Sequence, residues 1–167
     1  MKVIDVHAHI VFEETLNFLD KEGPEIGGDD INPWFRVGDY KLEGVRYRNT
    51  PFMDLNLRLD AMCSLGVDYQ VLSPNPITYF HFIDKHSAID YCKMHNDTMA
   101  KAILGHEDSL GGFATLPMQD PHEASKELER CIQDLGLKGA YIGTDFPSGI
   151  GHHSMDELYK TFVELDV

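Results

Sequence analysis

The sequence predicts an α/β fold in which strands alternate with single helices. Three observations predict it: segments with the β-branched and aromatic composition of strands, helical apolar spacing between them, and capping residues where helices should begin and end. Strands separated by one helix pair in parallel. Two architectures satisfy this order, a doubly wound open sheet and part of a (β/α)₈ barrel.

The first predicted strand covers residues 2–9 and has no solvated face. Its alternating positions divide the side chains into two sets. The set expected against covering helices is Ile4, Val6 and Ala8. The opposite set, which should face the interior, includes His7 and His9 at the end of the strand.

Residues 12–53 follow with many Gly, Pro and Asp residues and little periodicity, as in an insertion or an active-site loop region. Three of the five arginines, Arg36, Arg46 and Arg48, fall within thirteen residues here. A local basic spot in an acidic protein suits a small anion. A solvated loop face explains the same residues equally well.

Regular elements begin after this region. The leucines and methionine from Leu55 to Leu65 predict a helix that stops at Gly66, and capping residues predict another from Asp120 to Gly136. Further elements are strands at 67–74, 110–117 and 137–144, a helix over about 84–104, and a last helix that a Ser154–Glu157 capping box would open.

Composition narrows the function classes. The net charge of −14 argues against binding to nucleic acid or to an anionic membrane surface. No apolar run is long enough for a membrane span and the start lacks a signal-peptide pattern, so we expect a cytoplasmic protein. Cys63, Cys92 and Cys131 lie far apart, which predicts buried free thiols rather than disulfides or a zinc knot.

The H-x-H spacing of His7 and His9 permits chelation. Residues i and i+2 of a strand lie on one face about 6.6–7 Å apart along the strand, and two imidazoles from there can share one ion. Parallel α/β folds gather reactive groups at this end of their strands. Paired neutral imidazoles suit zinc, and also iron, manganese or nickel. Because two buried unpaired histidines would be costly, a shared metal is the favoured interpretation.

Other histidines carry weaker predictions. Asp145, His152 and His153 follow the fourth predicted strand and would reach the same rim, although an exposed loop is the favoured interpretation. His81 and His86 also follow a strand end, where a pocket lining is the minority interpretation. The remaining predictions are a packed core position for His95 and surface positions for His106 and His122.

Five segments together resemble a known family. "IDVHAHI" resembles the first-strand motif of the amidohydrolase superfamily. "GVDYQVLSPNP", "HNDTMA", "GGFATLPMQDP" and "ELERCIQDLGLKGAYIGT" resemble, in order and at similar spacing, segments of its aminocarboxymuconate-semialdehyde decarboxylase branch. The resemblance runs from Lys2 to Phe162 and is specific for the branch, not for a substrate.

The resemblance implies a (β/α)₈ TIM barrel of metal-dependent hydrolase type with one divalent metal, zinc or in some members manganese. Residues 1–167 would be a single domain, the N-terminal half of the barrel with about its first four βα units. His7 and His9 would be metal ligands. Arg46 would hold the carboxylate of a small-molecule substrate, with Arg48 as the fallback. We also expect a homodimer.

Further ligands and the proton donor would then come from residues after Val167 or from another chain. The predicted function is a metal-dependent decarboxylase of a small aromatic or muconate-type acid. Two alternatives stay open: a metal-dependent hydrolase of an amide, lactone or ring C–N or C–O bond, and a non-catalytic half-barrel that needs a partner chain.

Overall fold

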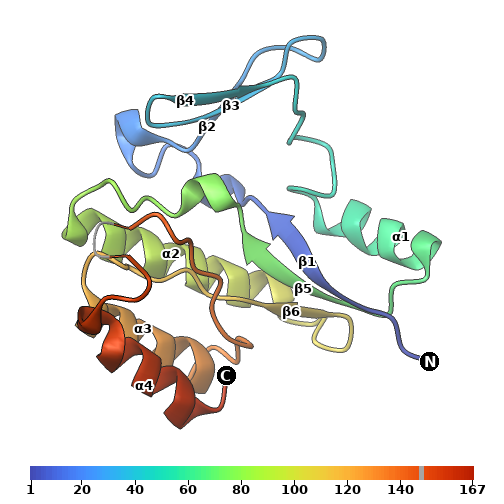
Figure 1. Ribbon diagram of the computed structural model, residues 1–167. Helices are drawn as coiled ribbons and strands as arrows, with labels where there is room; N and C mark the ends of the chain where they lie inside the picture. Colours follow the sequence, from blue (N-terminus) through green and yellow to red (C-terminus); the bar gives the residue numbers. More distant parts are fainter. Residues whose placement is uncertain (147–148) are drawn as a thin grey trace.

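A three-stranded parallel sheet in the order β1–β5–β6 lies at the centre of the computed structural model, which describes residues 1–146 and 149–167 (Figure 1). The strands are β1 (Ile4–Ile10), β5 (Tyr69–Pro74) and β6 (Leu110–Gly112). Single helices connect β5 to β6 and follow β6, as the parallel pairing requires. The α/β class predicted from the sequence is confirmed.

The pairing of β1 with β5 brings the carboxyl ends of both strands to one level. Ile4 lies opposite Tyr69 at the start, and Ile10 lies opposite Pro74 at the end. The register shifts between Asp5 and Ala8, so the middle of β1 departs from the regular ladder. His7 therefore lies in the irregular part of the strand.

Three helices begin where the sequence predicts, because each has an aspartate N-cap. They are α1 (Leu55–Leu65), α2 (Lys85–Ile103) and α3 (Pro121–Gln133). The side chains of Asp54, Asp84 and Asp120 accept hydrogen bonds from backbone N–H groups of the first turns. Gly66 ends α1 in the left-handed conformation, with φ 69°.

The last helix, α4 (Asp156–Leu165), forms as predicted, but the predicted capping box does not. A short 3₁₀ turn, η4 (His153–Met155), precedes it, and the His152 side chain accepts from the Ser154 N–H. Glu157 bonds to the His122 ring instead, at 2.7 Å. The histidine therefore caps the 3₁₀ turn, and α4 begins without a side-chain cap.

Residues 137–144 were predicted as a fourth strand, but only one parallel bridge forms, between Ala114 and Ala140. The chain does run beside the segment after β6, since the Lys138 N–H donates to the Gly112 carbonyl and the Tyr141 N–H to that of Ala114. Among the described residues no strand pairs with its other edge.

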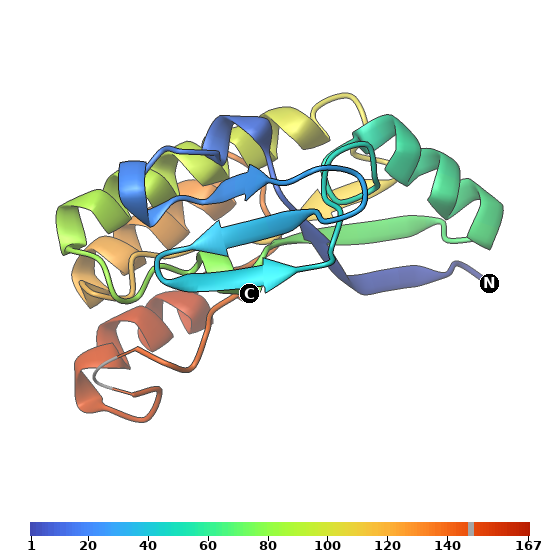
Figure 2. The ribbon, with the colours of Figure 1, turned by 90° about the horizontal axis from the view of Figure 1, so that it is seen from above.

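Helices α1, α2 and α3 share a core with the parallel sheet, and α4 packs against α3 (Figures 1 and 2). Ala8 and Ile10 of β1 lie in this core with Leu72, Leu110 and Leu128. Ile4 and Val6 were expected against covering helices, but they are 56% and 60% exposed. Asp5, which lies between them, faces α1 through Gln70 and Arg58, so Ile4 and Val6 point away from that helix.

Residues 12–53 contain more regular structure than their periodicity indicates. Three short strands, β2 (Glu25–Gly27), β3 (Trp34–Val37) and β4 (Tyr40–Glu43), form an antiparallel sheet. This small sheet lies beyond the carboxyl ends of β1 and β5 (Figure 1). The same region holds the 3₁₀ turns η1 (Glu13–Thr15) and η2 (Asp20–Glu22), and η3 (Pro76–Thr78) follows β5.

A second apolar cluster, the insertion cluster, attaches the small sheet to α2. Its buried members are Val11, Phe35, Val37, Tyr47, Phe80 and Tyr91. Phe35 stacks on Tyr47 with ring centroids 4.6 Å apart, and Phe80 meets Tyr91 edge to face at 4.7 Å. The insertion therefore shares a core with the rest of the chain.

All three cysteines are free, as predicted; Cys92 and Cys131 are buried, whereas Cys63 is exposed, contrary to the prediction. Cys63 lies on the outer side of α1, away from the core stripe that contains Met62. Of the helices in residues 1–146 and 149–167, none combines the length and the apolar character of a membrane span.

His95 on α2 is a core residue, as predicted, and its burial makes the stability of the fold depend on pH. The side chain is 2% exposed, contacts Phe12 edge to face, and its Nδ1 has no hydrogen-bond partner. Burial lowers the pKa of His95 from 6.5 to about 4. The unfolded chain therefore binds a proton at a higher pH than the folded chain does.

The contribution of a neutral His95 to stability is complete above pH 6.5 and should be lost as pH falls from 6.5 towards 4. The full loss is about 3 kcal/mol. In His95→Leu, urea unfolding at a series of pH values should show a smaller decrease of unfolding free energy over this interval. The control His106→Leu, at an exposed position, should retain the wild-type slope. An unchanged slope in His95→Leu would contradict this assignment.

Candidate metal centre

The imidazoles of His7 and His9 converge at the carboxyl end of β1, as the H-x-H spacing predicts. Their Nε2 atoms are 3.2 Å apart and the ring centroids 4.9 Å, with the planes nearly perpendicular. Two nitrogens bound to one tetrahedral zinc at about 2.0–2.1 Å would lie about 3.3–3.4 Å apart. The separation in the folded chain therefore fits two ligands of one ion.

The hydrogen bond of His9 Nδ1 determines that Nε2 is the ring nitrogen available to bind a metal. Its Nδ1 is 3.0 Å from the carbonyl oxygen of Pro74, an acceptor, so Nδ1 donates and carries the hydrogen. In the neutral ring Nε2 then has the lone pair, which is the arrangement of metal-binding histidines. Burial is the main cause that lowers the pKa of His9, and so favours this neutral form.

The two histidines supply only part of a metal site. Within the described part of the chain, no group of three or more His, Cys, Asp or Glu residues is placed to hold one ion. A catalytic zinc usually has three protein ligands and an open position. The donor set therefore suits a divalent metal but needs further ligands.

Aromatic side chains extend from the histidines along the same edge of the sheet. Tyr141 meets the His9 ring at a centroid distance of 5.6 Å, and Tyr79 stacks on Tyr141 at 6.1 Å. His81 stacks on Tyr79 at 5.5 Å. Burial raises the pKa of the Tyr79 phenol above its ordinary value of 10, so it remains protonated.

A hydrogen bond joins Asp145 and His81 at the far end of this row. Nδ1 of His81 lies 2.8 Å from Oδ1 of Asp145. A side chain at Gly143 would lie within 3.0 Å of both residues, so this glycine permits their approach. The Asp145 side chain is 81% exposed, in agreement with the favoured interpretation of an exposed loop.

The other histidine candidates are not joined to the pair on β1. The rings of His152 and His153 contact each other at a tilt, with centroids 4.2 Å apart, and both residues are exposed, as the favoured interpretation predicted. His86 is exposed in the first turn of α2. Surface positions are confirmed for His106 and His122.

Arg46 and Arg48 follow the small sheet and line a hollow of about 430 Å³. Arg46 Nη2 pairs with Asp30 Oδ1 at 3.0 Å, and Arg48 Nη1 pairs with Glu13 Oε2 at 2.6 Å. Each guanidinium is about half exposed, at 46% and 50%. Neither His7 nor His9 lines this hollow.

Sequence reasoning missed three polar residues next to the histidines. Arg58 of α1 and Gln70 of β5 are buried, and they form hydrogen bonds with the backbone of His9 and with Asp5. A signal was present, because Arg58 lies three residues after Leu55 and four before Met62, on the apolar stripe of the helix. A charged residue on a buried stripe indicates a specific partner.

Comparison with known proteins identifies the family. The amidohydrolase family model matches residues 4–167. The chain belongs to the amidohydrolase family. The resemblance that "IDVHAHI" and the following motifs indicate is thereby confirmed.

The curated relatives of this amidohydrolase chain include decarboxylases. Gamma-resorcylate decarboxylase of Rhizobium sp. is 34% identical over 117 residues, which are 70% of this chain and 35% of the relative. The 2-amino-3-carboxymuconate-6-semialdehyde decarboxylase of Dictyostelium discoideum is 28% identical and matches 98% of this chain and 45% of the relative. The chain thus spans between a third and a half of their length.

A solved structure shows the same arrangement of elements. A dihydroxybenzoic acid decarboxylase from Polaromonas sp., with bound manganese and the inhibitor 2-nitroresorcinol, superposes with a TM-score of 0.75 at 26% identity. The match covers 100% of this chain and 48% of that protein. The α/β fold of this amidohydrolase therefore matches that of TIM-barrel decarboxylases.

The hydrogen bond from His9 to Pro74 predicts one tautomer. In nitrogen-15 NMR spectra of the metal-free protein above pH 7.5, His9 should carry its hydrogen on Nδ1 and have an unprotonated Nε2. The exposed His106 serves as the reference for an unconstrained ring. A hydrogen on Nε2 of His9 would contradict the arrangement described here.

Proposed function

We propose that this chain carries the first-strand part of the metal site of a decarboxylase that acts on a small aromatic or muconate-type carboxylic acid. The observation that carries the proposal is the pair of Nε2 atoms, 3.2 Å apart, at the end of β1. The names of the relatives above support decarboxylation over hydrolysis and over a non-catalytic role.

The proposal includes an architecture and an assembly. Residues 1–167 would form the N-terminal half of a (β/α)₈ barrel with about four βα units, and polypeptide outside this range would supply the remaining strands and ligands. The exposed edge of β1 is consistent with further pairing there. A homodimer and a cytoplasmic location are part of the same proposal.

The proposed metal is divalent. His7 and His9 would hold it, with zinc as the first choice and manganese as the second, because imidazole nitrogen suits both. The manganese in the Polaromonas decarboxylase supports the second choice. When bound, such a cation would supply positive charge that stabilises negative charge on substrate oxygens.

Within this chain, Arg46 is the proposed carboxylate anchor, with Arg48 as the alternative. Arg46 can present two parallel N–H groups to a carboxylate, which orients the acid as well as binding it. It would exchange the exposed carboxylate of Asp30 for that of the substrate. In the reaction the bond to the carboxyl carbon breaks, carbon dioxide leaves, and the electron pair stays on the carbon that carried the carboxyl group, which then takes a proton.

Metal content tests the histidines. The purified full-length protein should contain about one divalent ion per chain by mass spectrometry, and His7→Ala should contain much less, because one imidazole alone is a poor chelator. The control His106→Ala should retain the wild-type content. A folded wild-type protein that binds no divalent metal would refute the proposal.

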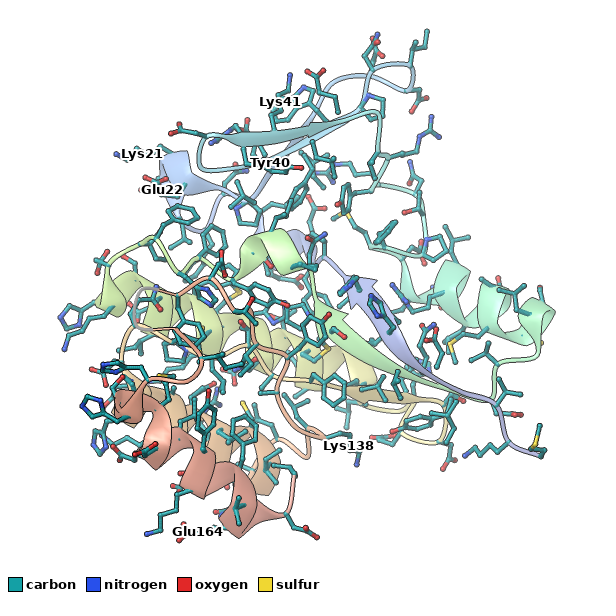
Figure 3. All side chains as sticks on the ribbon, in the orientation of Figure 1. Lys21, Glu22, Tyr40, Lys41, Lys138 and Glu164 are labelled. Atoms are coloured by element: carbon teal, nitrogen blue, oxygen red, sulfur yellow. The ribbon has the colours of Figure 1, made fainter. Side chains whose placement is uncertain are left out.

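Carbon dioxide release tests the anchor. With 2,6-dihydroxybenzoate and related aromatic or muconate acids, Arg46→Ala should lower kcat/KM between about 10-fold and 100-fold, the value of a charge-assisted hydrogen bond. Lys41→Ala is the matched control, since Lys41 lies on the outer side of the small sheet (Figure 3). A loss in Arg48→Ala with none in Arg46→Ala would transfer the role to Arg48.

A further inference from the structure

Arg58 is the one deeply buried arginine of the described chain. Its side chain on α1 is 6% exposed, whereas the other four arginines are at least partly exposed. In residues 1–146 and 149–167 no carboxylate lies within ion-pair distance of its guanidinium, and its Nε has no hydrogen-bond partner. Burying a cation in this way is costly, and an apolar side chain would pack α1 at lower cost.

The guanidinium forms two hydrogen bonds, one to β1 and one to β5. Nη2 donates to the backbone carbonyl of His9 at 2.6 Å. Nη1 donates to Oε1 of Gln70 at 2.7 Å. Arg58 therefore contacts one candidate metal ligand directly through its main chain.

Gln70 continues the network to the other candidate ligand. It lies opposite Asp5 in the β1–β5 register, and its Nε2 donates to Asp5 Oδ2 at 2.7 Å. The second oxygen of Asp5 accepts from the backbone N–H of His7 at 2.9 Å. The amide of Gln70 is thus oriented with its oxygen towards Arg58 and its nitrogen towards Asp5.

These contacts hold the part of β1 that the backbone ladder does not. The register shift lies between Asp5 and Ala8, so His7 lacks regular pairing with β5. One guanidinium fixes the strand on both sides of this irregularity, at His9 directly and at Asp5 through Gln70. The separation of the two Nε2 atoms depends on the backbone positions at these points.

We propose that Arg58 is a positioning residue, which through the His9 carbonyl and the Gln70–Asp5 relay holds the His7 and His9 rings at the separation that a shared divalent metal requires. This inference rests on the proposed function, because it assigns a role towards the same metal. The alternative is that Arg58 only attaches α1 to the sheet.

The test is the affinity of the metal-free full-length protein for Zn²⁺, measured by calorimetry at a temperature where circular dichroism shows each variant to be folded. Arg58→Met removes both hydrogen bonds and should weaken Zn²⁺ binding between about 10-fold and 100-fold, the usual effect of losing a group that orients a ligand. Arg58→Lys keeps the charge but cannot bridge two acceptors, so it should show an intermediate loss.

Two further variants separate positioning from packing. Gln70→Met interrupts the relay and should also weaken Zn²⁺ binding, and its effect should not add to that of Arg58→Met in the double variant. Met62→Ala, on the same helix but outside the network, should lower the melting temperature and leave Zn²⁺ affinity unchanged.

Each outcome decides the inference. Zn²⁺ affinity that falls in step with stability in all variants, Met62→Ala included, would leave Arg58 a purely structural role. Wild-type affinity in Arg58→Met, together with loss of binding in His9→Ala, would overturn the positioning role and leave the proposed metal site intact. Wild-type affinity in His9→Ala would overturn the proposed metal site itself. If Arg58→Met does not fold, Gln70→Met decides the question through the same readout.

Discussion

The parallel pairing of β1 with β5 is the constraint on which the site depends. The pairing of the two strands continues to Ile10 and Pro74, so the loop after β5 starts beside the end of β1. Proline donates no backbone hydrogen bond, and the carbonyl of Pro74 accepts one from the His9 ring. The orientation of one imidazole therefore follows from strand pairing, and the convergence of the two rings follows from that orientation.

Elements with strong local signals could be predicted from the sequence almost to the residue. Asp84, for example, caps a helix predicted over about 84–104 and observed as Lys85–Ile103. The strands of the small sheet could not be predicted from the sequence, because three or four residues are too few to establish an alternating period. The segment at 137–144 has strand composition, but its ladder depends on neighbours that composition does not reveal.

The same division applies to the site. The approach of His7 and His9 was predictable because alternation along a strand is a local property. The bond from Gln70 to Asp5 joins residues 65 apart in sequence, and no local pattern encodes it. Ser154 shows the limit of a local motif: the sequence S-x-x-E is present, yet α4 has no side-chain cap and Glu157 has another partner.

The insertion cluster couples the small sheet mechanically to the helical layer. A sheet attached only by its two connecting segments could move relative to the rest of the chain. In this protein Phe35 and Tyr47 pack among side chains from α2 and from the loop after β5. Separating the small sheet from α2 would expose these aromatic side chains to water, and the free-energy cost grows with the apolar area exposed. The small sheet is therefore held to the helical layer by packed side chains and is not free to turn about its two connections.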